Sequence, residues 1–160
     1  MEYLLDTNIF IQSKNTMPFD LWPTFWQKFE ALLSTGHLHS IWKVKEEIER
    51  GNDDLCEWIK VHLPRSFFIV MDEDIMREYV NLSKAIRIGT LYNEQALYDF
   101  YQKADSYLIA TAAAKGMTVV TFEGSRPDSK KRVLIPDACN KIGVPYCNLN
   151  SIFKELGATI

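Results

Sequence analysis

The sequence is poor in the features that mark membrane-spanning and disulfide-stabilised proteins. Its three cysteines are an odd number at irregular spacing, which is typical neither of a disulfide framework nor of a zinc site. No apolar run is long enough to span a membrane, and the run that follows Met1 is too short for a signal peptide. We therefore expect a cytoplasmic protein whose thiols are reduced and mostly buried.

An excess of positive charge is also missing. The formal net charge is -3, which excludes a bulk polycation that holds nucleic acid by charge alone. Binding to nucleic acid would need local basic patches or bound cations. Hydrophobic residues make up 47% of the 160 residues and charged residues 24%, which is ordinary for a globular protein. This length predicts one domain, residues 1–160, with a sizeable core.

What the sequence does contain is an alternation of apolar runs and amphipathic helices. Continuous apolar runs predict buried strands at 3–5, 66–71, 117–122 and 144–149, and 37–41 is either a strand or an extended link. Apolar residues recur at helical spacing between these runs. Strands that alternate with helices predict an α/β fold, with a central, mostly parallel sheet of four to five strands flanked by helices.

Several details of the helices are predicted from single residues. Leu21 begins an apolar stripe that continues through Phe25 to Leu33 and is stopped by Gly36. Asn150 is expected to cap the C-terminal helix. The aromatic residues at helical spacing are expected to lie mostly in the core: Trp22, Phe25, Trp26, Phe29, Trp42 and Trp58.

Three acidic residues stand at the ends of predicted elements. Asp6 follows the first strand, Asp105 opens the helix before the strand 117–122, and Glu123 ends that strand. The carboxyl ends of parallel strands meet in a crevice where ligands bind, and Glu47 in the helix predicted over 41–50 could join them there. Like charges raise each other's pKa unless a cation neutralises them, and Mg²⁺ or Mn²⁺ prefers carboxylate and water oxygens.

Each acid taken singly also has a purely structural interpretation. Asp6 and Asp105 could serve only as helix N-caps, and Glu123 could be a solvated turn residue. Glu46, Glu47 and Glu49 could belong to one exposed helix face. Taken together, acids at the functional edge of one sheet favour a shared site.

Four motifs resemble the PIN domain in order and spacing across nearly the whole chain. They are LLDTNIFI around Asp6, VKEEI around Glu47, ADSYLIATA around Asp105 and VVTFE ending at Glu123. Two further segments, FDLWP and IPDAC, look like one bacterial subgroup of that family. The resemblance implies a three-layer fold and a metal-dependent nuclease that usually acts on RNA, often as the toxin of a VapC-like toxin–antitoxin pair.

The resemblance also implies roles for the acids. By position, Asp6, Glu47 and Asp105 would hold Mg²⁺ or Mn²⁺, and Glu123 would complete the site directly or through water. The sequence departs from the family at Glu123, where many relatives have aspartate, so the number of metal ions is left open. Glu46 would replace Glu47 if the helix register were shifted by one residue.

Other polar residues are assigned to the surroundings of the metal. Asn8 and Thr121 would orient carboxylates or water. Four basic residues follow Glu123 and could contact RNA phosphates, or form only a solvated loop: Arg126, Lys130, Lys131 and Arg132. His37 and His39 would share one face of an extended segment, but a third ligand is not evident nearby, so surface or packing roles are favoured.

Two other functions compete with the ribonuclease. In a phosphatase-like hydrolase Asp6 would be the nucleophile, but that chemistry usually needs a second aspartate two residues on, where this chain has Asn8. In a binding or scaffold protein the fold would remain without the chemistry. The expected partners are an RNA substrate and an antitoxin protein, and exposed apolar helices could form a homodimer. No membrane association is expected.

Overall fold

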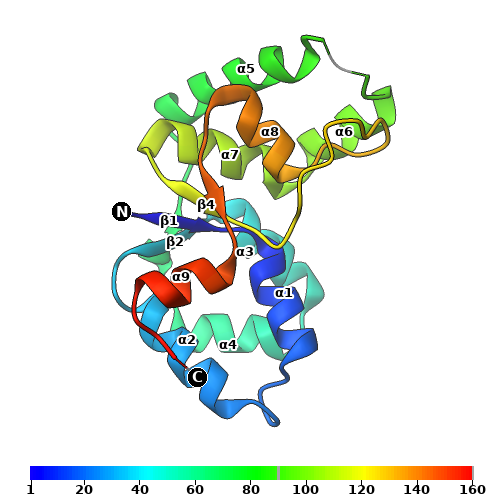
Figure 1. The fold of residues 1–160 in the computed structure, drawn as a ribbon. Coiled ribbons are helices and arrows are strands. Elements are labelled where there is room, and N and C mark those ends of the chain that lie inside the picture. The colour runs from blue at the N-terminus through cyan, green and yellow to red at the C-terminus, as the bar shows by residue number, and fades with distance from the viewer. Residues whose placement is uncertain (90, 160) are drawn as a thin grey trace.

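The first strand of the chain lies in the middle of the central sheet (Figure 1). The computed structural model describes residues 1–89 and 91–159. Within these residues, five strands form one sheet in the order β3-β2-β1-β4-β5, and all neighbouring pairs are parallel. Tyr3 pairs with Leu38 on one side and Thr118 on the other. The strands are β1 (Tyr3–Leu5), β2 (Leu38–Ile41), β3 (Phe68–Ile69), β4 (Thr118–Val120) and β5 (Tyr146–Cys147).

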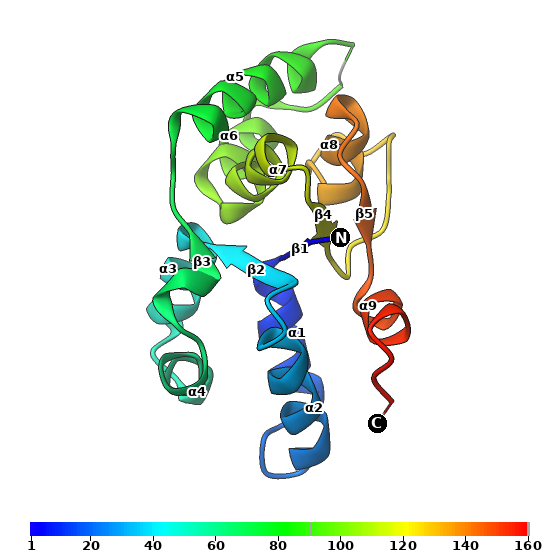
Figure 2. The same cartoon turned by 90° about the vertical axis from the view of Figure 1, so that its left-hand side faces the viewer.

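Helices cover both faces of the sheet, which gives three layers (Figure 2). One face carries α5 (Glu73–Arg87), α6 (Glu94–Gln102), α7 (Ala104–Lys115) and α8 (Ile135–Ile142). The other carries α1 (Thr7–Thr16), α2 (Pro23–Leu33), α3 (Trp42–Gly51), α4 (Asp54–His62) and α9 (Leu149–Glu155). The predicted α/β fold, with a mostly parallel sheet of four to five strands flanked by helices, is confirmed.

The sheet is buried on both sides, which explains its continuous apolar runs. Leu4 and Leu5 of β1 and Val119 and Val120 of β4 are completely buried. Successive side chains of a strand point to opposite faces, so burial of consecutive residues requires a layer on each side. The buried polar residues Asp6 and Thr121 come directly after these two strands, at their carboxyl ends.

Aromatic side chains fill much of the layer formed by α1, α2 and α4. The ring centroids of Phe10 and Phe29 are 5.9 Å apart, and those of Trp26 and Trp58 are 5.0 Å apart. Phe25 is buried in the same cluster. The prediction that the aromatic residues are mostly core is therefore confirmed for this group.

The start of α2 differs from the prediction. Leu21 is 72% exposed and precedes the helix, and Trp22 is half exposed. The helix begins at Pro23, whose fixed φ suits the first helical position. The predicted apolar stripe was therefore extended too far toward the N-terminus.

The edge strands are shorter than predicted. In the segment 66–71 only Phe68 and Ile69 pair with β2, because Arg65–Phe67 forms a 3₁₀ turn and Val70 is exposed. In the segment 144–149 only Tyr146 and Cys147 form a strand. An edge strand has one neighbour, so its extent depends on tertiary pairing that local patterns do not report.

The prediction that Asn150 caps the C-terminal helix is wrong. Helix α9 begins at Leu149, and its cap is Asn148, whose side-chain oxygen accepts a hydrogen bond from Ser151 N at 3.0 Å. Two asparagines flank Leu149, and the earlier end of β5 moves the helix start by two residues.

Cysteine usage follows the prediction. Cys56, Cys139 and Cys147 are free thiols, of which the first two are buried. Burial raises the pKa of Cys139 to about 12, so this thiol stays protonated. Across residues 1–89 and 91–159, each helix is too short or too polar to cross a membrane.

Candidate active site at the carboxyl edge of the sheet

Asp6 lies where β1 turns into α1. Its backbone N–H donates to Val120 O at 3.1 Å, so the residue still follows the sheet. It occupies the N-cap position of α1, yet its side chain makes no capping hydrogen bond. The carboxylate instead accepts a hydrogen bond from Thr121 Oγ1 at 3.1 Å and is only 1% exposed. The Asp6 carboxylate is therefore held by the Thr121 hydroxyl, which follows the neighbouring strand β4.

Asp105 reaches the same pocket from the other layer. It lies in the first turn of α7, one residue after Ala104, with which the helix begins. A pocket of about 350 Å³ opens between the start of α1, α3 and the start of α7. The side chains that line it are Asp6, Thr7, Asn8, Ile11, Glu47, Arg50, Lys103, Asp105 and Arg132.

The acids in this pocket perturb each other's ionisation. Burial raises the pKa of Asp6 well above its usual value, and the charges of Asp105 and Glu123 raise it further. Burial, Glu123 and Glu47 together raise the pKa of Asp105 to about 7. Lys103 and Arg132 act in the opposite direction on Asp105. The site thus concentrates negative charge that a cation would stabilise.

Glu47 is held by two protein donors. Its Oε2 accepts from Thr7 Oγ1 at 2.7 Å, and its Oε1 accepts from the backbone N–H of Ala104 at 2.8 Å. The side chain therefore ties the starts of α1 and α7 together across the pocket. Glu46, the alternative in the predicted register, is exposed and pairs with Lys43 at 3.5 Å.

Glu123 sits beside this pocket and lines an adjoining one. Its Oε1 pairs with Arg132 Nη2, and its Oε2 accepts from the N–H of Ile135 at 2.8 Å. Its side chain is 12% exposed, so it is not a solvated turn residue. Its charge contributes to the raised pKa of both Asp6 and Asp105.

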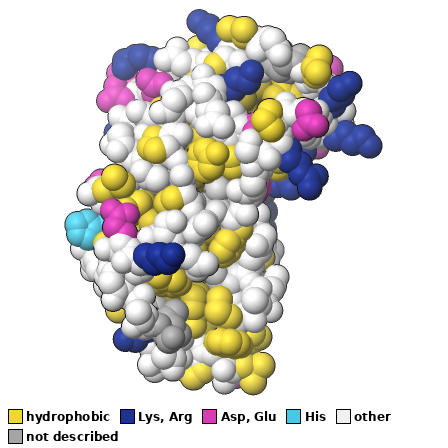
Figure 3. All heavy atoms as spheres, in the orientation of Figure 1, with side chains coloured by type: hydrophobic (Ala, Val, Ile, Leu, Met, Phe, Trp, Pro, Cys, Tyr) yellow, Lys and Arg dark blue, Asp and Glu magenta, His cyan; other side chains and the backbone are white. Residues whose placement is uncertain are grey.

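The remaining predicted residues divide between the pocket and its edge. Asn8 lines the pocket, and Thr121 bridges Asp6 and the backbone N–H of Glu123. Arg126 and Lys131 line the two adjoining hollows. Figure 3 shows Lys and Arg side chains gathered where Figure 1 places α6 and the segment between β4 and α8.

Sequence reasoning missed three residues of the pocket. These are the polar residues Thr7, Arg50 and Lys103, for which the sequence motifs predict no role in the site. Two of them carried a usable signal. Arg50 lies one helical turn after Glu47, and Lys103 comes two residues before Asp105.

The donor set can be tested for its fit to a divalent cation. Over residues 1–89 and 91–159, no three His, Cys, Asp or Glu side chains form a metal-binding cluster. The oxygens of Glu47 and Glu123 are engaged by protein donors. Asp6 and Asp105 fit Mg²⁺, which keeps several waters and takes one or two carboxylates. Direct binding by Glu47 or Glu123 stays a prediction.

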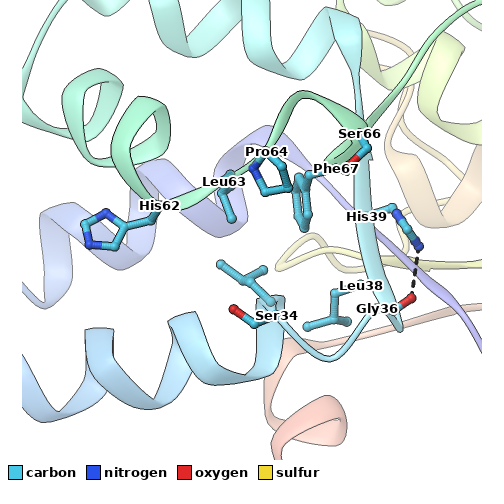
Figure 4. A pocket seen from close by; sticks show the side chains of 10 residues that line it. Ser34, Gly36, Leu38, His39, His62, Leu63, Pro64, Ser66 and Phe67 are labelled. Atoms are coloured by element: carbon cyan, nitrogen blue, oxygen red, sulfur yellow. Dashed lines mark hydrogen bonds between the residues drawn. The ribbon is translucent and has the colours of Figure 1, made fainter.

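Another hollow, of about 280 Å³, lies between the end of α2, the start of β2 and the segment that follows α4 (Figure 4). It contains His39 and His62, which lie at opposite ends and do not point toward one another. His39 Nε2 lies 3.1 Å from Gly36 O, and His62 Nδ1 lies 2.8 Å from Trp58 O. Of the predicted pair, His37 is exposed and His39 is partly buried with this backbone contact, which agrees with the surface or packing roles expected for them.

Comparison with known proteins assigns the chain to a family. A family model described as a domain of unknown function, DUF4411, matches residues 3–160. The chain belongs to this family. No curated protein matches the DUF4411 chain.

Solved structures similar to the DUF4411 chain show its fold. VapBC2 from Rickettsia felis, bound to a DNA fragment from their promoter, matches with a TM-score of 0.56 and 17% identity, over 92% of this chain and 98% of that one. FitAcB from Neisseria gonorrhoeae matches with a TM-score of 0.55 and 18% identity, over 91% and 96%. FitAB bound to an IR36 DNA fragment matches with a TM-score of 0.54 and 19% identity, over 91% and 94%. The DUF4411 chain therefore has the PIN-like fold that its motifs predicted.

Proposed function

We propose that the protein is a metal-dependent endoribonuclease that hydrolyses RNA phosphodiester bonds and serves as the toxin of a toxin–antitoxin pair. The observation that carries this proposal is the meeting of Asp6 and Asp105 in one pocket at the carboxyl edge of the sheet. Asp105 and Glu123 raise the pKa of buried Asp6, and Glu123 and Glu47 raise that of Asp105, so the two carboxylates need a cation to ionise together. We propose Mg²⁺ or Mn²⁺ for that role.

The protein's own residues would divide the work of the reaction. Asp6 and Asp105 hold the cation, and Thr121 keeps the Asp6 carboxylate oriented. Glu47 holds the two helix starts together through Thr7. The cation, when bound, lowers the pKa of water and offsets charge on the phosphate.

Cationic side chains around the pocket are suited to the substrate. Arg50 and Lys103 line the pocket beside the acids and can bind phosphate oxygens of the RNA. Arg126, Lys130 and Lys131 extend the positive charge along the segment between β4 and α8. A chain with net charge -3 needs such local positive charge to attract a polyanion.

We also propose that the protein binds an antitoxin protein. This follows from the PIN-domain motifs and from the likeness to VapBC2, which was solved with a DNA fragment from their promoter. A homodimer stays a prediction.

RNA cleavage by purified protein tests the proposal. We expect cleavage of single-stranded RNA with Mg²⁺ or Mn²⁺, and its loss, by about 100-fold or more, in Asp6→Asn and in Asp105→Asn. Asp53→Asn is the matched control, because Asp53 caps α4 away from the pocket. Equal cleavage by wild type and both pocket variants would reveal a contaminating nuclease and contradict the proposal.

The same variants separate the ribonuclease from its rivals. A phosphatase that uses Asp6 as nucleophile would hydrolyse small phosphomonoesters in preference to RNA. A scaffold protein would bind divalent ions weakly, and Asp6→Asn would leave that binding unchanged. Measuring phosphomonoester hydrolysis and Mn²⁺ binding beside RNA cleavage therefore distinguishes the three functions.

A further inference from the structure

A loop rich in basic residues joins β4 to α8 beside the acidic pocket. This basic loop comprises residues 124–134 and lines, together with Glu123, a hollow of about 400 Å³. Its charged side chains are four basic and one acidic: Arg126, Lys130, Lys131, Arg132 and Asp128. Arg132 lines this hollow and also the pocket that contains Asp6 and Asp105, so the two spaces adjoin at one side chain.

Two carboxylates close the basic loop in opposite directions. Glu123 precedes the loop, and its Oε2 accepts a hydrogen bond from the N–H of Ile135, just after the loop, at 2.8 Å. Asp137 follows the loop, and it accepts hydrogen bonds from Ser125 Oγ and, at 2.9 Å, from the N–H of Arg126. Each carboxylate therefore reaches across to the opposite end of the loop, which fixes the two ends relative to one another.

Asp137 is the member of this pair that the proposed reaction does not use. It lies in the first turn of α8 and is only 6% exposed. Acids are common in the first turn of a helix because they interact favourably with the helix dipole. The two oxygens of Asp137, however, accept hydrogen bonds from residues 12 and 11 positions earlier in the chain. This side chain therefore holds the basic loop as well as its own helix.

A turn fixes the backbone that follows Arg126. The N–H of Ser129 donates to Arg126 O at 3.0 Å, and Pro127 stands at the second position of this turn, where its fixed φ is favourable. Farther along the loop, the N–H of Asn93 donates to Lys130 O at 3.0 Å. The backbone of the loop is thus held along its length, while its basic side chains are exposed.

The hollow beside the loop has the lining of a phosphate site. Arg126 and Arg132 provide two guanidinium groups, and Ser129 provides a hydroxyl. The acid in this hollow is Glu123, whose charge is offset by its ion pair with Arg132. A guanidinium has several N–H donors, so Arg132 can pair with Glu123 and still donate to a phosphate oxygen.

We propose that this hollow binds a phosphate group of single-stranded RNA that neighbours the scissile one, and that Asp137 is the positioning residue that sets Arg126 for this contact. The inference rests on the proposed function for the identity of the ligand. A loop that is fixed before binding loses little conformational freedom on binding, so its phosphate contacts contribute more to affinity. Asp137 itself lies behind the loop and acts on the RNA only through Arg126.

RNA binding without cleavage tests this inference. The affinity of the full chain for a fluorescein-labelled single-stranded RNA is measured by fluorescence anisotropy, with a chelator in place of divalent ions and at several salt concentrations. We expect Arg126→Gln to weaken binding by about 10-fold and to reduce the slope of log affinity against log salt by about 0.7, the loss of one phosphate contact. Asp137→Ala should do nearly the same, although it leaves every basic residue in place.

The direction of the Asp137→Ala effect separates positioning from simple electrostatics. By charge alone, removing an acid near a polyanion should tighten binding. Asp128→Ala is the matched control, because it removes an exposed acid from the turn of the same loop. It should leave binding unchanged or tighter. Unchanged or tighter binding in Asp137→Ala would overturn the inference, as would an equal weakening in Asp128→Ala.

Two further comparisons separate positioning from general destabilisation. In Asp137→Asn the amide oxygen can accept from the N–H of Arg126 and the amide nitrogen can donate to Ser125 Oγ, so binding should stay within about 3-fold of wild type. In the Arg126→Gln background, Asp137→Ala should have little further effect, because the two changes remove one contact. Equal losses in Asp137→Asn and Asp137→Ala, or additive losses in the double variant, would contradict positioning through Arg126.

Circular dichroism and thermal unfolding check that each variant is folded. If Asp137→Ala does not fold, Ser125→Ala takes its place, because it removes one of the two donors to Asp137 from an exposed position. Ser125→Ala should weaken RNA binding by about 3-fold, and only while Arg126 is present. Full affinity in Ser125→Ala would overturn the inference in that case.

Failure of this inference differs from failure of the proposed function. The function is judged by RNA cleavage that depends on Asp6 and Asp105. The inference is judged by the binding of intact RNA when the basic loop loses its anchor. A chain that cleaves RNA but binds it equally well in Asp137→Ala would keep the function and lose the inference. A chain with the expected binding and no cleavage would keep the phosphate site and lose the function.

Discussion

The starts of helices α1 and α4 place an aspartate in the same local position with opposite results. Asp53 caps α4 by accepting hydrogen bonds from the N–H groups of Leu55 and Cys56, and it pairs with Lys14 at 3.2 Å. Its pKa is lowered: burial opposes ionisation, but the Lys14 contact and the two backbone N–H groups outweigh it. Asp6 makes no capping bond, is buried beside other acids and has a raised pKa.

The difference shows what separates a structural carboxylate from one available to a ligand. At α4 the protein supplies donors and a cation, so ionisation of Asp53 stabilises the fold. At α1 the protein supplies burial and like charges, so ionisation of Asp6 costs stability until a cation arrives. Residue type and helix position are shared, and only the surroundings differ.

The largest change in the free energy of unfolding should come from replacing Asp105, one of the acids in the pocket of Asp6. The pKa of Asp105 is raised to about 7 in the folded protein, above its value near 3.8 in the unfolded chain. The folded state then binds more protons between these values, so this group makes stability fall as pH rises from about 4 to about 7. In metal-free protein, Asp105→Asn should become more stable than wild type by a growing margin over that window, measured by urea unfolding at each pH.

The margin should reach a few kcal/mol and stay constant above the upper pH. Saturating Mn²⁺ should reduce or reverse it, because only the wild-type carboxylate binds the ion. A pH-independent difference between Asp105→Asn and wild type would show that Asp105 is not destabilised by its surroundings.

The next largest change in the free energy of unfolding should come from replacing Asp53, which caps α4. Asp53→Ala removes a cap that satisfies two N–H groups, and it should lower the free energy of unfolding by about 1–2 kcal/mol. Asp54→Ala is the matched control. Asp54 pairs with Lys14 at 3.0 Å, but its side chain is exposed and caps nothing, so we expect less than about 0.5 kcal/mol. Equal losses would mean that the ion pair, and not the cap, stabilises α4.

The smallest change in the free energy of unfolding should come from replacing Thr121, which donates a hydrogen bond to Asp6. Thr121→Val removes the hydroxyl that donates to Asp6 and accepts from Glu123 N–H, at a cost of about 1 kcal/mol. The pKa of Asp6 should rise further, so the acidic limb of the pH–rate profile of RNA cleavage should move to higher pH. Thr118→Val, at the start of β4 and away from the pocket, should leave the profile unchanged.

Local patterns predicted most of the fold. A strand that is buried on both faces appears in the sequence as a continuous apolar run, and this pattern correctly predicted β1 and β4. It failed at the edges, where β5 is only Tyr146–Cys147 and α9 starts at Leu149. Short edge strands and helix starts depend on which neighbour is present, and one sequence window does not contain that neighbour.

The sequence by itself determined which acids stand at the ends of elements, and therefore that Asp6, Asp105 and Glu123 belong to one edge of the sheet. Tertiary structure alone decided their electrostatic state. Burial, the Thr121 hydroxyl, the Arg132 guanidinium and the donors to Glu47 come from segments far apart in the chain. The ionisation of a carboxylate depends on the charges and hydrogen-bond donors within a few ångströms of it, and the order of residues in the chain does not give those distances.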